Sequence, residues 1–293
     1  MPVLDGYELV TPGSLGEALA DLAAHPQARP FAGGTDLMVV LEAGHLPPGR
    51  YVNLAKCAEL SGVASTPDGG LTIGALTTYT EIRHAPAIAA RWSMLGLAAA
   101  ETGGIATQNR GTIGGNIANA SPAADTPPVL LVYDASLDLV SASGTRRVPY
   151  TAFHRGYKQM DLRPGELIAR VILPSRLNPS NPSNPVNPWR DYYRKVGTRR
   201  AQAISKVCFA GTLRMDGPTV ADVRIALGSV APTVIRATAA EQALRGRALD
   251  AGAVADAERA LASGIAPIDD MRSTARYRSR VAVNLLREFV AAH

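Results

Sequence analysis

The chain has 293 residues, a formal net charge of +5 and a hydrophobic fraction of 46%, values typical of a globular protein with a sizeable core. No apolar run reaches the roughly 18 residues of a membrane-spanning helix, and no basic-then-apolar leader opens the chain, so we expect a cytoplasmic protein without a membrane span. Two cysteines and five scattered histidines argue against a protein-bound metal or a disulfide framework. The basic residues are spread along the chain and aromatic residues make up only 5%, which argues against a nucleic-acid partner.

The first fifty residues predict a helix, a strand, a helix and a strand. Ser14 and Glu17 form a capping-box pattern before an amphipathic helix that begins at Leu15. A brief strand is predicted over 29–32, followed by a helix over 36–43 that ends at Gly44.

A second group of elements is predicted after residue 70. A strand over 71–75 precedes the capping-box pattern of Thr78 and Glu81, and one helix is predicted over 86–101. Another helix should begin after Thr126, where two prolines fit the tolerated first turn. The segments 136–142 and 146–150 predict a hairpin.

Four Asn-Pro pairs recur with a period of three over residues 178–188. Proline at this period favours polyproline II and interrupts both helices and sheets. We expect an exposed connector here, with a short proline recognition motif as the alternative.

The C-terminal segment predicts two strands, 206–215 and 220–228, joined at Asp216-Gly217. Helices should follow, beginning at a capping-box pattern formed by Thr238 and Glu241. The last helix should begin near residue 274. Four residues at i, i+4 spacing are expected to form its core stripe: Tyr277, Val281, Leu285 and Phe289.

Two glycine-paired loops carry the functional signal. Residues 31–37 read FAGGTDL and residues 111–116 read GTIGGN, about eighty residues apart. Glycine lets backbone N–H groups approach an anion closely, and threonine adds a hydroxyl donor. Two such loops predict a ligand with two linked phosphates, although either loop alone would be read as a turn. The chain lacks a GxGxxG Rossmann fingerprint and a P-loop.

The stretch 107–128, TQNRGTIGGNIANASPAADTPP, closely resembles the signature of the FAD-binding subunit of molybdenum hydroxylases, the xanthine dehydrogenase and aerobic CO dehydrogenase family. AGGTDL from Ala32 resembles that family's other flavin motif. Further matching segments cover nearly the whole chain: 73–78, 165–168, 172–174, 193–195, 199–200, 203–207, 225–232 and 277–278.

The resemblance implies an α+β fold in which two α/β subdomains form an FAD-binding domain of the vanillyl-alcohol-oxidase type, followed by a C-terminal α+β domain. We expect the FAD-binding domain over 1–177, with subdomains of about 1–55 and 56–177. The connector would span 178–189, and the C-terminal domain, an antiparallel sheet plus helices, would span 190–293.

The resemblance also implies an extended FAD whose pyrophosphate lies between the two glycine loops. Ser121 and Asp125 are implied as contacts to ribityl or ribose hydroxyls. The Ile168 backbone would face the isoalloxazine edge, and Lys195, with Tyr193, would lie by the ring. The alternative for Lys195 is a solvated lysine near the connector. The implied pyrophosphate and ribityl contacts are Phe31, Ala32, Gly33, Gly34, Thr35, Asp36, Leu37, Thr112, Ile113, Gly114, Gly115 and Asn116.

The function that follows is an FAD-carrying electron-transfer subunit. The resemblance implies a molybdenum-containing large subunit, a small subunit with [2Fe–2S] clusters, and a dimer of heterotrimers. The chain passes directly from Asp125 to Pro127-Pro128, so the [4Fe–4S] loop of some relatives should be absent. We expect no catalytic acid or base in this chain. The alternatives are a free-standing FAD-dependent oxidase or dehydrogenase and a structural subunit that has lost its flavin.

Overall fold

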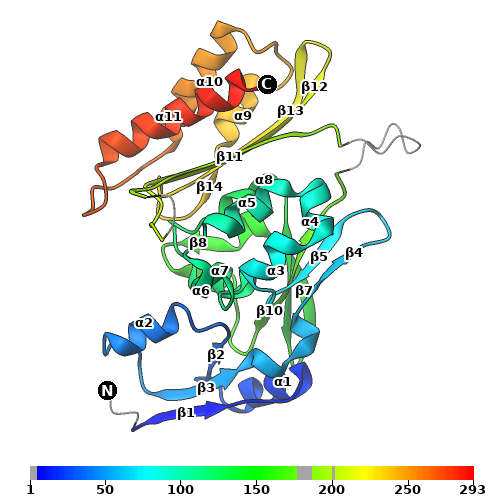
Figure 1. The fold of residues 1–293 in the computed structure, drawn as a ribbon, viewed down its shortest axis with the longest axis vertical. Helices are drawn as coiled ribbons and strands as arrows, with labels where there is room; N and C mark the ends of the chain where they lie inside the picture. Colours follow the sequence, from blue (N-terminus) through cyan, green and yellow to red (C-terminus); the bar gives the residue numbers. More distant parts are fainter. Residues whose placement is uncertain (1–4, 177–186, 200–201) are drawn as a thin grey trace.

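The computed structural model describes residues 5–176, 187–199 and 202–293, in which helices surround sheets stacked along the long axis (Figure 1). The N-terminal sheet is parallel, in the order β1-β3-β2. Its strands are β1 (Tyr7–Val10), β2 (Arg29–Phe31) and β3 (Gly49–Asn53), and its helices are α1 (Leu15–Ala24) and α2 (Leu37–Glu42).

Local signals position most of this first part. Only half of the predicted Ser14–Glu17 capping box forms at the start of α1: the Ser14 hydroxyl accepts from the Glu17 amide, but the Glu17 carboxylate accepts from the Gly13 amide. Gly44 adopts a φ of +70° after α2, as predicted. The sequence reading missed β1, which pairs with β3 over four residues. The first and last of its four residues are half-buried and the middle two exposed, so it lacks the alternation that marks a strand.

The second sheet has five antiparallel strands in the order β4-β5-β10-β6-β7. The predicted hairpin is present as β6 (Ser136–Ser141) and β7 (Gly144–Pro149). The other strands are β4 (Val63–Ser65), β5 (Leu71–Gly74) and β10 (Leu167–Leu173), beside the short pair β8 (His154–Gly156) and β9 (Gln159–Met160).

Helices cover this second sheet. The capping box of Thr78 and Glu81 is present at the start of its helix, and a further helix begins at Pro127 as predicted. The helices are α3 (Tyr79–His84), α4 (Pro86–Arg91), α5 (Ser93–Glu101), α6 (Ile105–Gln108), α7 (Ile113–Asn119) and α8 (Pro127–Val132). Single 3-10 turns occur at η1 (Leu54–Lys56), η2 (Ala58–Leu60) and η3 (Tyr150–Ala152).

The prediction of one continuous helix over 86–101 is wrong. The chain leaves the helical conformation at Trp92, where φ is −125° and ψ is 41°, and α5 begins at the next residue. The Trp92 side chain is 1% exposed within the main core cluster. The break therefore coincides with the burial of the largest side chain of this segment, which the helical spacing did not reveal.

The third sheet is antiparallel, in the order β11-β12-β13-β14, and lies between two layers of helices (Figure 1). On the opposite face of β12 from Cys208, Ala210 and Thr212, the side chains of Val207, Phe209 and Leu213 pack in one cluster with the C-terminal helices. The elements are β11 (Arg190–Val196), β12 (Val207–Asp216), β13 (Thr219–Gly228), β14 (Ile235–Arg236), α9 (Thr238–Leu244), α10 (Ala251–Gly264) and α11 (Ala275–Ala291).

Two details of this part differ from the sequence reading. Helix α9 begins at Thr238, but no capping box forms, because the Glu241 carboxylate accepts hydrogen bonds from the Ile225 amide and from Arg236. Of the stripe on α11, Leu285 and Phe289 are buried, whereas Tyr277 is 43% exposed. The Lys206 ammonium instead lies over the Tyr277 ring, 5.3 Å from its centroid.

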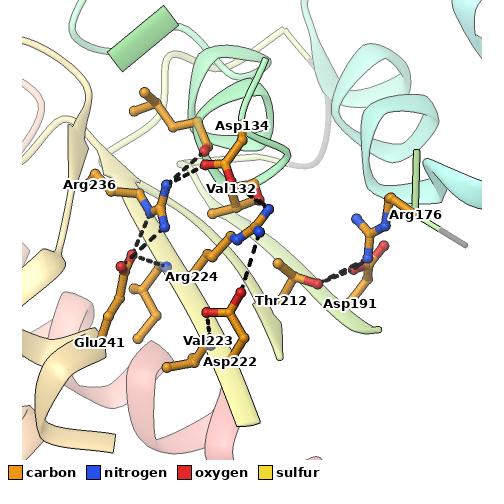
Figure 2. A network of polar contacts seen from close by, with 12 residues as sticks. Val132, Asp134, Arg176, Asp191, Thr212, Asp222, Val223, Arg224, Arg236 and Glu241 are labelled. Atoms are coloured by element: carbon orange, nitrogen blue, oxygen red, sulfur yellow. Dashed lines mark hydrogen bonds and ion pairs between the residues drawn. The ribbon is translucent and has the colours of Figure 1, made fainter. Parts of the chain in front are cut away.

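Charged side chains join the third sheet to the preceding helices. Figure 2 shows Arg224 and Arg236 converging on Asp134, at 2.7 and 2.8 Å, at the end of α8. In the same view Asp191 accepts hydrogen bonds from Arg176 and Thr212. The two parts of the chain are thus connected by ion pairs as well as by apolar contacts.

The α+β class expected from the sequence is confirmed. Most of the predicted Asn-Pro connector, residues 178–186, lies outside the described residues. Within the described ranges, no helix is long and apolar enough to cross a bilayer.

Candidate functional site

A cavity of about 790 Å³ opens where both glycine loops meet β10 and the β8–β9 hairpin, a size suited to a small cofactor. It is lined by Arg29, Pro30, Ala32, Gly33, Gly34, Thr35, Asp36, Leu37, Leu54, Leu60, Ala75, Leu76, Tyr79, Thr102, Thr107, Gly111, Thr112, Gly114, Gly115, Asn116, Ala118, Asn119, Lys158, Met160, Leu162, Glu166, Leu167, Ile168 and Ile204. A smaller cavity of about 380 Å³, near β5 and β6, contains none of the predicted site residues.

The two glycine loops are in direct contact. A Cβ atom placed on Gly33 would lie 1.8 Å from the Arg110 carbonyl oxygen, so only glycine allows this approach. The Arg110 guanidinium also donates to the Gly33 carbonyl at 3.3 Å. The close approach brings the two predicted motifs to one wall of the cavity.

The first loop presents unused backbone donors. Among the described residues, no hydrogen-bond acceptor of the chain engages the amides of residues 33–36. Gly34 has a φ of +76°, a conformation that lets successive amides turn toward one side. A row of free amides beside a cavity is suited to binding an anion.

The second loop, in contrast, uses three of its backbone amides for hydrogen bonds within the chain. The amide of Ile113 donates to the Thr77 carbonyl, and that of Gly114 donates to the Ala75 carbonyl. The Gly115 amide donates to the Thr112 hydroxyl, which caps α7. A Cβ on Gly114 would lie 2.6 Å from the Ala75 Cβ, so this glycine allows internal packing. The second loop can therefore offer a ligand surface and side chains, but these three amides are already used.

The cavity also has an apolar side. Leu54, Leu60 and Leu167 belong to one buried cluster, and Leu76 packs against it. All four line the cavity together with Ile168, which belongs to the neighbouring core. An apolar side facing free amides matches the chemistry of a ligand that combines flat rings with phosphates.

Asp125 and Lys195 form a buried ion pair outside the lining residues. Their side chains are 9% and 4% exposed, and the Lys195 ammonium lies 2.7 Å from the carboxylate. Ser205 donates to the other carboxylate oxygen at 2.5 Å, and Lys195 also donates to the Glu101 carbonyl. Burial raises the pKa of Asp125, and Lys195 opposes that rise. The alternative of a solvated Lys195 is therefore wrong.

The structure brings most predicted site residues to the cavity, but not all. Of the predicted contacts, Ala32 through Leu37, Ile168 and four residues of the second loop line it: Thr112, Gly114, Gly115 and Asn116. Tyr193 lies against Cys208, 3.6 Å from the sulfur, and burial raises its pKa well above its ordinary value. The predicted residues that are not among the lining residues are Phe31, Ile113, Ser121, Asp125, Tyr193 and Lys195.

Sequence reasoning missed several lining residues with polar groups, among them Arg29, Tyr79, Lys158 and Glu166. Glu166 is paired with Arg146 at 2.7 Å, and burial raises the pKa of Tyr79. No periodicity or spacing indicated these residues, because each reaches the cavity through the packing of distant elements. No group of three or more His, Cys, Asp or Glu side chains suited to a metal ion occurs in the described part of the chain.

Comparison with known families gives two matches. Residues 5–176 match the family described as the FAD binding domain in molybdopterin dehydrogenase. Residues 192–292 match the family described as the CO dehydrogenase flavoprotein C-terminal domain.

Individual relatives agree along nearly their full length. The chain is 30% identical to the xanthine dehydrogenase FAD-binding subunit of Escherichia coli O157:H7, with 95% of this chain and 92% of the relative covered. It is 32% identical to the glyceraldehyde dehydrogenase medium chain of Sulfolobus acidocaldarius, with 94% of each covered. A solved structure of carbon monoxide dehydrogenase from Hydrogenophaga pseudoflava superposes with a TM-score of 0.90 at 29% identity, covering 98% of this chain and 96% of the other.

Proposed function

Because the chain belongs to the family with the FAD binding domain of molybdopterin dehydrogenases, we propose that its cavity binds FAD through the residues that sequence and structure bring there. The chain is an FAD-binding subunit of the molybdenum hydroxylase type and part of an oxidoreductase. Bound FAD supplies the redox chemistry, and the protein supplies binding, orientation and electrostatics.

The free amides of residues 33–36 are the observation that carries the assignment. They would donate to the pyrophosphate, with Thr35 and Thr112 adding hydroxyl donors and Asn116 an amide side chain. The close approach of Gly33 to Arg110 would keep both loops beside the same phosphates. The apolar residues around Ile168 would take a flat ring and exclude water from it.

The remaining predicted contacts are not among the lining residues of the cavity. Ser121 and the buried group of Asp125, Tyr193 and Lys195 would border the flavin from the C-terminal side, where β11 meets the preceding helices. In this proposal Lys195 acts together with Asp125 and not as a lone cation. The proposed domains are 1–177 for FAD binding and 190–293 for the C-terminal part.

The electrons would come from outside the chain. We propose a molybdenum-containing large subunit and a small subunit with [2Fe–2S] clusters as partners, in a dimer of heterotrimers. The relatives include medium chains of carbon monoxide dehydrogenase and of other dehydrogenases, which supports a multi-subunit assembly. Two buried free cysteines suit a reducing compartment such as the cytoplasm.

The test is to purify the chain alone, record its absorption spectrum and identify the flavin released by heat. We expect FAD, because a site built for two phosphates would bind the single phosphate of FMN less well. FMN alone, or a chain that takes up no flavin when FAD is supplied, would contradict the proposal. Oxidation of a small organic substrate by the chain alone would instead favour a free-standing oxidase.

A further inference from the structure

Lys158 occupies an unusual place at the cavity. It stands in the two-residue turn between β8 and β9, at a φ of +56°, in the left-handed region where glycine or asparagine is normally found. A lysine gains nothing from this backbone conformation itself. Strained positions of this kind persist where the surrounding structure fixes them, and they cluster at ligand and active sites.

The side chain of Lys158 reaches across to the end of α7. Its ammonium donates to both the carbonyl and the side-chain oxygen of Asn119, the latter at 2.6 Å. His154 of the same hairpin lies 2.9 Å from the Ile117 carbonyl, and burial lowers its pKa. The hairpin is thus attached to the helix of the second loop at two points.

Asn119 extends this connection to the first glycine loop. Its side-chain amide donates to the Asp36 carboxylate at 3.2 Å, and Asp36, Asn119 and Lys158 all line the cavity. The ammonium is therefore linked, through one side chain, to the loop with the free amides. Lys158 and these amides share one region of the cavity wall.

The other charges of the lining leave Lys158 available. Glu166 is paired with Arg146, and Arg29 donates to the Tyr51 hydroxyl and the Pro47 carbonyl. Asp36, the remaining carboxylate of the lining, accepts from the Asn119 side-chain amide and is not paired with Lys158. Within the described ranges, the ammonium of Lys158 contacts only the uncharged oxygens of Asn119 and forms no ion pair. It is exposed to solvent, so it can turn to an anionic ligand without first breaking a salt bridge.

We propose that Lys158 is the cation that binds the diphosphate of FAD, held at the cavity by the strained β8–β9 turn. The inference rests on the proposed function and adds a residue to its site. On binding, the ammonium exchanges its contacts with the uncharged oxygens of Asn119 for a phosphate oxygen, so that donor and acceptor both carry charge and the hydrogen bond becomes an ion pair.

The experiment compares FAD with riboflavin, which lacks phosphate, as ligands of the flavin-free chain, using quenching of flavin fluorescence. Lys158→Gly removes the side chain at a φ that glycine adopts without strain, so we expect the fold to be retained. FAD should bind about tenfold more weakly, equivalent to about 1.4 kcal/mol. Riboflavin binding should stay within about twofold, and the salt dependence of FAD binding should become shallower.

Two further variants complete the design. Lys158→Arg keeps the charge and should restore most of the FAD affinity, whereas the matched control Lys56→Met, at an exposed lysine outside the lining, should change neither ligand. Unchanged FAD binding by Lys158→Gly would overturn the inference while leaving the proposed function intact. Equal weakening of FAD and riboflavin would also overturn it, because Lys158 would then only shape the cavity. A wild-type chain that binds no FAD would overturn both.

Discussion

The buried pair of Asp125 and Lys195 allows a quantitative prediction. Replacing Lys195 with methionine leaves a carboxylate that is 9% exposed without its counter-ion. Removing one partner of a buried ion pair costs about 3–5 kcal/mol, because the remaining charge is desolvated and unpaired. The Ser205 hydroxyl still donates to Asp125 and offsets part of this cost, so we expect about 3 kcal/mol for Lys195→Met at pH 8.

The double variant Asp125→Asn/Lys195→Met tests the cause. It leaves no buried charge, and Asn still accepts from Ser205, so its free energy of unfolding should lie within about 1–2 kcal/mol of the wild type. Urea unfolding followed by far-UV circular dichroism and tryptophan fluorescence measures all three proteins. Equal destabilisation of the single and double variants would refute the reasoning, because the deficit would then be a loss of packing.

The pH dependence has a definite sign. Burial already raises the pKa of Asp125, and loss of Lys195 should raise it further above its ordinary value of about 3.9. The relevant pH window lies between the ordinary pKa of the aspartate in the unfolded chain and the raised pKa of Asp125 in the folded variant. Within this window the folded variant binds more protons than the unfolded chain, so its free energy of unfolding increases as the pH falls. The deficit of Lys195→Met should be constant above the raised pKa and shrink below it, whereas the double variant should show no such trend.

Two further predictions concern the loops and the flavin. Gly33→Ala places a Cβ 1.8 Å from the Arg110 carbonyl oxygen and should lower both thermal stability and flavin content. The control Gly264→Ala, with open space around its Cβ, should change neither. Full flavin occupancy in Gly33→Ala would count against the contact between the loops. Lys195→Met should lower the flavin reduction potential and Asp125→Asn should raise it, because removal of either charge leaves the other uncompensated. If potentiometric titration gave an unchanged flavin midpoint potential in both variants, the Asp125–Lys195 pair would have only a structural role.

Features set by neighbouring residues could be predicted from the sequence. The capping box of Thr78 and Glu81 and the hairpin at Asp216-Gly217 involve residues within a few positions of each other. Their geometry depends on backbone preferences and short side chains that no distant element has to supply. The two glycine loops could be found for the same reason, since glycine marks a position where the backbone turns or another group comes close.

The capping-box spacing gave a wrong prediction at the start of α9, where groups distant in the sequence compete for the glutamate. Thr238 and Glu241 have the spacing of a capping box, yet Glu241 binds the Ile225 amide and Arg236 instead. A charge-assisted contact to a buried amide outweighs an exposed helix cap, and only the packing of α9 against β13 makes that amide available. Likewise, the periodicity of residues 86–101 could not show that the helix is interrupted at the buried Trp92.

The sequence by itself determined the family resemblance, the two glycine motifs and most of the short-range elements, because each is encoded in residues that are close along the chain. Only the tertiary structure decided how the motifs are used: the first loop keeps its amides free, whereas the second donates its amides to Ala75, Thr77 and Thr112. It also pairs Asp125 with Lys195 across 70 positions and brings Lys158 to Asn119 across 39. Such contacts depend on which elements pack together, and that packing is set by burial of apolar surface over the whole fold.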